Sequence, residues 1–160
     1  MPDLSEGLTY SGRIVVTPTL TVHAGYAAND YVGTSGVAMT FAGAARVPGG
    51  TGYIQSAVLV DALLASVAGE LWMFDTIPTP PADSAAWTIT DAFALGLVGI
   101  IPFSTYYASA VNSVSVYTGM PIGFKCLAGS IDLYGCFVTR GAPAYAATGD
   151  ISFKIVTIQD

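Results

Sequence analysis

The sequence consists of short runs in which apolar and polar residues alternate, separated by clusters of glycine, proline and small polar residues. Residues 37–41, 53–61 and 151–158 are clear examples. Alternation with a period of two is typical of strands that bury one face. Because no long run with helical periodicity separates these strands, a parallel sheet built from strand–helix–strand units is excluded. The pattern predicts an all-β chain.

The turn clusters recur at the spacing found in β-sandwiches and barrels, and they indicate eight to ten strands. We therefore expect a two-sheet sandwich of the jelly-roll kind. Residues 82–86 are the best candidate for a single helical turn, with Asp83 as its cap. A short turn at 128–130 predicts a hairpin. Trp72 is expected in the core, and Trp87 over one end of the sandwich.

The first twelve residues differ from the rest because they are polar and contain glycine. They predict an extended N-terminal arm at 1–12, followed by a single sandwich domain at 13–160. The sequence shows no internal repeat and no composition shift that would indicate a second domain.

Charged residues are unusually sparse, since only 10% of the chain is Asp, Glu, Lys or Arg and 52% is hydrophobic. A compact monomer of this size exposes about 7,500 Å², so on average there is one charged side chain for about every 470 Å² of surface. Gaps of that size approach the largest apolar patches of monomeric proteins. Either small polar residues cover these gaps or other protein does, and we expect burial in an assembly.

The charge balance also excludes nucleic acid as a partner. Five basic against eleven acidic residues give a net charge of −6, which is unsuited to nucleic acid.

The longest apolar run, at 92–103, is shorter than the roughly 20 residues of a membrane-spanning helix. Residues 1–6 lack the features of a signal peptide. Cys126 and Cys136 are expected to be free buried thiols, as in a protein made in a reducing cytosol.

No catalytic, cofactor or metal residues are predicted. His23 is the single histidine and has no ligand or triad partner in its neighbourhood, and no nucleophile elbow is present. The glycine-rich loop at 48–52 lacks the Lys-Ser/Thr of a phosphate-binding loop. The densest carboxylates show no spacing that indicates a glycosidase pair, although a calcium site on their loops stays open. These carboxylates are Asp61, Glu70, Asp75 and Asp83.

Tyr106 and Tyr107 lie in the polar stretch 104–115 and are the best candidates for an exposed aromatic surface. Such a surface suits a protein interface or a platform for stacking a sugar, and internal packing is the alternative.

Several segments together resemble small virion structural proteins of tailed bacteriophages, and the resemblance extends from Thr17 to the C-terminus. Its motifs are turn and core signatures and include no catalytic residues. The segments are GYAANDYVG at 25–33, MTFAGAAR at 39–46, GYI at 52–54, LWMFDTIPT at 71–79, DSAAW at 83–87, KCLAGSIDLYG at 125–135 and TGDISF at 148–153.

The resemblance implies a capsid decoration (cement) protein that is made in the host cytoplasm, joins the virion and stabilises the shell. Its partners would be the major capsid protein and copies of itself, typically as a homotrimer. Leu4, Leu8 and Tyr10 of the arm would then contact the major capsid protein or a neighbouring subunit, together with Tyr106 and Tyr107. The alternative is a head-fibre, tail or baseplate protein that binds host glycan.

Overall fold

The computed structural model describes residues 10–20, 25–119 and 121–160, with the backbone alone for Tyr10. These residues form eleven strands and one four-residue helix, which confirms the all-β prediction. The elements in chain order are β1 (Tyr10–Val16), β2 (Tyr31–Val32), β3 (Met39–Phe41), β4 (Thr51–Asp61), β5 (Gly69–Phe74), α1 (Asp91–Ala94), β6 (Leu97–Phe103), β7 (Tyr106–Ala108), β8 (Ser113–Tyr117), β9 (Ile122–Lys125), β10 (Leu133–Thr139) and β11 (Ile151–Gln159).

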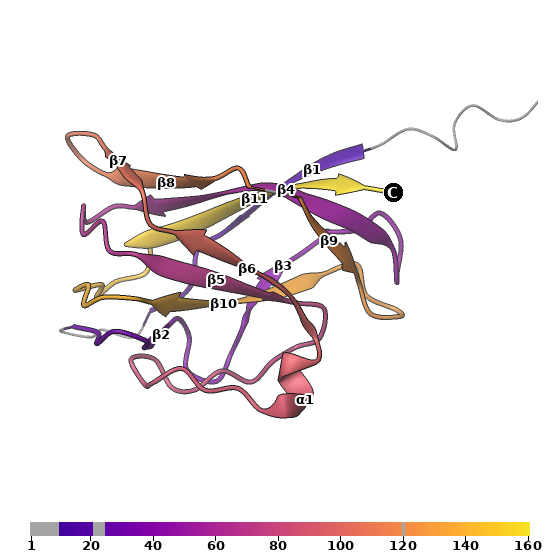
Figure 1. Ribbon diagram of the computed structural model, residues 1–160, viewed down its shortest axis with the longest axis horizontal. Helices are drawn as coiled ribbons and strands as arrows, with labels where there is room; N and C mark the ends of the chain where they lie inside the picture. The colour runs from indigo at the N-terminus through magenta and orange to yellow at the C-terminus, as the bar shows by residue number, and fades with distance from the viewer. Residues whose placement is uncertain (1–9, 21–24, 120) are drawn as a thin grey trace, which may run out of the picture.

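The strands form two antiparallel sheets that pack face to face, so the predicted two-sheet sandwich is confirmed (Figure 1). The six-stranded sheet has the order β1-β11-β4-β8-β7, and β9 also pairs with β4. The five-stranded sheet has the order β2-β10-β5-β6, with β3 beside β10. The chain crosses between the sheets repeatedly, so the sequence-distant strands β4 and β11 become neighbours.

The main core lies between the two sheets and is rich in aromatic rings. Phe137 of β10 and Phe153 of β11 approach to 5.0 Å between ring centroids, and Phe103 lies 6.2 Å from Phe153. Every second residue of β11 points into this core, from Ile151 to Gln159. The alternation seen in the sequence therefore identifies the residues of this strand that point into the core.

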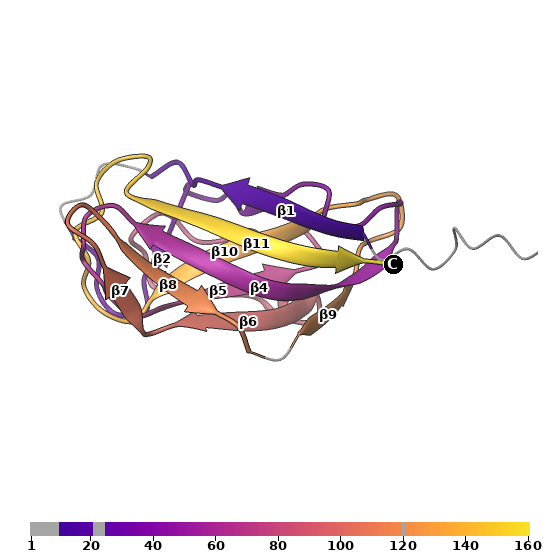
Figure 2. The same ribbon diagram turned by 90° about the horizontal axis from the view of Figure 1, so that it is seen from above.

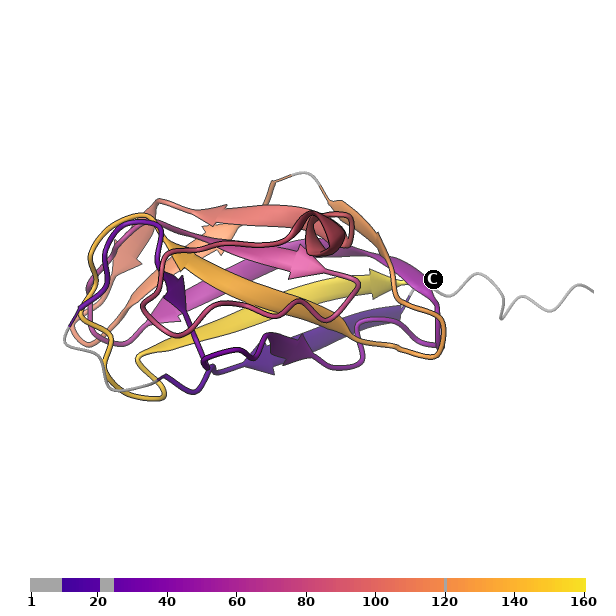
Figure 3. The same ribbon diagram turned by 90° about the horizontal axis from the view of Figure 1, so that it is seen from below.

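The outer face of the five-stranded sheet is covered by the segment 75–96, which crosses it in Figure 3. Trp87 of this segment packs against Trp72 at 5.5 Å and against Tyr31 at 6.0 Å between ring centroids. Trp72 points outward from β5 and is half-buried against this second cluster, so its expected core position lies under the covering segment and not between the two sheets. The reason is that apolar residues occupy both faces of a strand covered on both sides.

The predicted helical turn at 82–86 is wrong, and the only helix among the described residues is α1, capped by Thr90. Ser84 has a φ of 62°, which is left-handed and ends any right-handed turn there. Asp83 accepts hydrogen bonds from the Tyr26 hydroxyl at 2.8 Å and from the Gly33 amide at 3.3 Å, so it ties two loops together and caps no helix.

The predicted hairpin at 128–130 is also wrong. A turn does form there, because the Ser130 amide donates to the Leu127 carbonyl at 2.9 Å. However, β9 pairs with β4 while β10 belongs to the other sheet, so the turn connects the two layers. Cys126 and Cys136 are free and buried as predicted, and burial raises the pKa of Cys136 to about 12.

The boundary between arm and domain differs from the prediction. Residues 10–12 belong to β1, where Tyr10 pairs with Gln159 and Gly12 with Thr157. Backbone pairing needs no apolar side chains, which explains why a polar, glycine-containing segment joins the sheet edge. Residues 1–9 of the predicted arm, and His23, lie outside the described residues. In the part that is described, no helix has the length and apolar character to span a membrane.

Candidate interaction surface

The outer face of the six-stranded sheet carries a cluster of valine side chains. Along β4, β8 and β11 the buried residues point toward the core, and the residues between them point outward. We name this surface the valine face and define it by six side chains: Val15, Val58, Val60, Val114, Val116 and Val156.

The strand register makes the valine face continuous. Val60 is paired with Val114 of β8, and Val114 is paired with Tyr107 of β7. One row along, Val58 is paired with Val116 on one side. Directly paired residues have side chains about 5 Å apart on the same side of the sheet. The valines therefore form one patch that extends from β1 to the aromatic ring of Tyr107.

No described segment crosses over this sheet as the segment 75–96 crosses the other one, as Figures 2 and 3 show from opposite sides. Val15 is 55% exposed and Val116 46%, while the remaining valines are partly buried by their neighbours. Strand spacings of about 4.8 Å and residue repeats of about 6.8 Å give this face an area of about 500 Å². That is near the upper limit for an apolar patch on a monomer.

The charges on this face are all positive. Arg13 is paired with Val156, and Lys154 is paired with both Val15 and Val58. The two cations are thus diagonal neighbours on the same side of the sheet. The outward positions of these strands carry no Asp or Glu, and Glu70, which pairs with Arg140, lies on β5 of the other sheet.

A shallow hollow of about 200 Å³ lies between the two cations and the valines. Arg13 and Lys154 line it, together with Val15, Val58 and Val60. The hollow thus combines an apolar floor with two positive charges.

Of the predicted interface residues, Tyr106 and Tyr107 point to opposite sides of the sheet. Tyr107 is 66% exposed and borders the valine face. Tyr106 points to the opposite side, where its hydroxyl donates to the Val67 carbonyl at 2.6 Å and burial raises its pKa to about 12. The prediction that both rings are exposed was wrong for Tyr106, because neighbouring strand residues point to opposite faces. Leu4 and Leu8 lie outside the described residues, as does the side chain of Tyr10.

The four carboxylates singled out in the sequence have different surroundings. Asp61 is buried at the end of β4, and Asp83 binds Tyr26 and Gly33 as described above. Asp75 lines an open cleft, and burial raises its pKa. Glu70 pairs with Arg140. Among the described residues, no three His, Cys, Asp or Glu side chains are grouped so that they could hold a metal ion.

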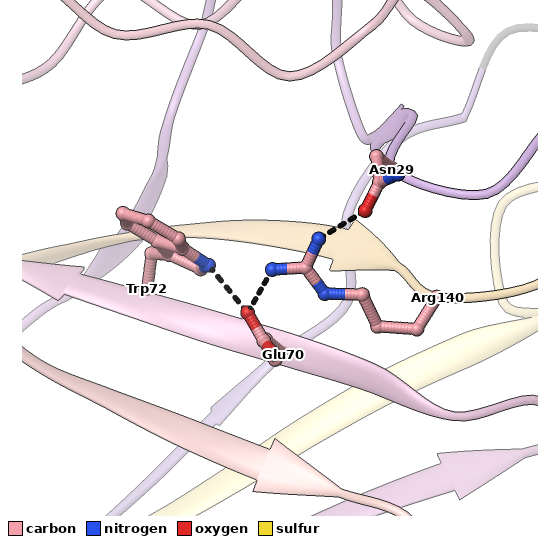
Figure 4. A network of polar contacts seen from close by, with 4 residues as sticks. All are labelled: Asn29, Glu70, Trp72 and Arg140. Carbon is pink, nitrogen blue, oxygen red and sulfur yellow. Dashed lines mark hydrogen bonds and ion pairs between the residues drawn. The ribbon is translucent and has the colours of Figure 1, made fainter.

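Glu70 belongs to a polar cluster near the start of β5 in the five-stranded sheet (Figure 4). The Arg140 guanidinium donates to Glu70 Oε2 and to Asn29 Oδ1, and Trp72 Nε1 donates to the same Glu70 oxygen at 3.1 Å. Through Arg140, these bonds fix to β5 the loop that contains Asn29, a residue with a left-handed φ of 74°. The Asn29 carbonyl also accepts from the Trp87 amide at 2.7 Å, which connects the cluster to the covering segment 75–96. We therefore assign the cluster a structural role.

The Glu70 cluster gives a pH-dependent stability. Its hydrogen bond from Arg140 lowers the pKa of Glu70 below the ordinary 4.5, so the carboxylate stabilises the fold above that pH and loses this effect as pH falls. We expect Glu70→Gln to reduce the free energy of unfolding by about 0.5–1 kcal/mol at pH 7 and by much less at pH 3. Urea denaturation at both pH values measures this, with Asp91→Asn as the exposed control. A difference of equal size at both values would contradict it.

The valine face was missed by the sequence analysis, although a signal for it was present. Residues 57–60 of β4 read Ala-Val-Leu-Val and are apolar on both faces, as in strands that are covered on both sides. In the comparisons with known proteins, no family model matches this chain and no curated protein is similar to it.

Proposed function

We propose that this chain is a non-enzymatic virion structural protein that acts as a homo-oligomeric capsid decoration protein and stabilises the head of a tailed bacteriophage. The valine face is the observation that supports this proposal. It is a flat apolar surface with two charges, and such surfaces are usual where proteins contact one another.

The area of the valine face supports burial against protein. The face of about 500 Å² includes Arg13 and Lys154, so removing its apolar part from water is worth at most about 12 kcal/mol before the costs of association are subtracted. The same area per partner is below the roughly 800 Å² of a standard stable interface. A single contact through this face would be weak, so repeated contacts in a symmetric assembly suit it better.

The resemblance to phage virion proteins supports a capsid as the assembly that this chain joins. A decoration protein needs a rigid domain and surfaces for its neighbours and the shell, and it needs no catalytic group. The major capsid protein would be the second partner, bound through a part of the surface that the valine face does not use.

Counting copies per particle tests this function. We expect quantitative mass spectrometry of purified virions to give on the order of hundreds of copies, because decoration follows the symmetry of the shell. About a dozen copies or fewer would overturn the proposal in favour of a tail, baseplate or fibre protein. In that case loss of glycan-array binding on Tyr107→Ala would identify a glycan-binding role.

A further inference from the structure

The charge on the valine face restricts what can cover it. Two of the chain's five basic residues, Arg13 and Lys154, lie on this face, and the outward positions of its strands carry no Asp or Glu. Two copies joined face to face would bring four cations into one apolar interface. Like charges in an interface are unfavourable, so the occupant should carry carboxylates beside apolar side chains.

Residues 1–9 of this chain have that composition. Their sequence, MPDLSEGLT, contains Asp3 and Glu6 and no Lys or Arg. Leu4, Glu6 and Leu8 are spaced two residues apart, so an extended backbone would present all three on the same side. Their spacing would be about 6.8 Å, which is the repeat of outward residues along the strands beneath.

The position of this segment allows it to reach a neighbour. It precedes Tyr10 at the start of β1, which is an edge strand of the six-stranded sheet. Nine extended residues span at most about 30 Å, which exceeds the width of the valine face.

We infer that the valine face of one copy is the docking site for residues 1–9 of a second copy. Leu4 and Leu8 pack on the valines, and Glu6 binds between Arg13 and Lys154. This inference rests on the self-association in the proposed function and names the segment that carries it. The exchanged segment adds contact area that the sheet face alone does not provide.

A charge exchange in the full chain tests the docking. We expect Lys154→Glu and Glu6→Lys each to weaken self-association at least about tenfold in sedimentation velocity, because each places like charges together. An equimolar mixture of the two variants should associate more strongly than either variant alone. In mixed contacts the unmodified segment meets the unmodified face, and the lysine introduced at position 6 meets the glutamate introduced at position 154. Lys125→Glu, which alters an exposed cation of β9, is the matched control and should associate normally.

Several results would overturn the inference. If the mixture associates no more strongly than either variant alone, residues 1–9 do not dock on the valine face of a second copy. If Lys154→Glu associates like the unmodified protein, Glu6 does not bind there. Counting virion copies separates these failures from that of the proposed function, since a protein with normal copy number keeps the function even when its segment docks elsewhere.

Discussion

Replacing Val58 with aspartate is expected to leave the domain folded and to abolish its self-association. Val58 is central in the valine face, where it is paired with Val116 and with Lys154. In the isolated domain the new carboxylate remains in water beside Lys154. In an assembly it would be desolvated among valines, which costs about 3 kcal/mol or more and raises the dissociation constant at least about a hundredfold.

Sedimentation over a range of concentrations measures this effect, and circular dichroism checks the fold. Val37→Asp is the matched control, because Val37 is 56% exposed in the loop between β2 and β3, away from the valine face. We expect the control to associate normally. If Val58→Asp and Val37→Asp associate equally well, the valine face is no interface and the proposed function loses its structural support.

The strands could be predicted from the sequence because each buries one face along a regular alternation. Residues 53–61 and 151–158 were predicted within two residues of β4 and β11. The pairing of these two strands could not be predicted, since their neighbours are set by crossovers between layers. The turn at 128–130 shows the same limit, because a local turn does not specify whether the next strand stays in its sheet.

The candidate site was harder to predict, because it depends on which face of a strand points outward and on what covers it. Trp72 and Val58 both point away from the central core. Trp87 of the segment 75–96 packs against Trp72, whereas no described segment crosses the sheet that contains Val58. Composition did indicate uncovered apolar surface through the scarcity of charge. Only the register of β4, β8 and β11 locates that surface on one sheet.

Asp61→Asn is expected to cause the largest loss of stability among the changes considered. Asp61 is fully buried, and its two carboxylate oxygens accept from the Leu63 amide at 3.0 Å and the Ser66 amide at 2.7 Å. An asparagine can present one oxygen, so its NH₂ group must face one of these donors. That backbone amide N–H would then be unpaired and would face another donor, the NH₂ group. This should cost about 2–4 kcal/mol.

The loop that Asp61 holds adds to this cost. Leu64 and Ser66 have φ values of 58° and 51°, which are unfavourable for residues other than glycine and persist only where other bonds fix them. Denaturation of Asp61→Asn in the Val58→Asp background would measure the monomer's stability without a contribution from association. Limited proteolysis should show faster cleavage near Leu64. A loss below about 0.5 kcal/mol, which is typical of exposed sites such as Asp91, would mean that the loop keeps its conformation without the carboxylate.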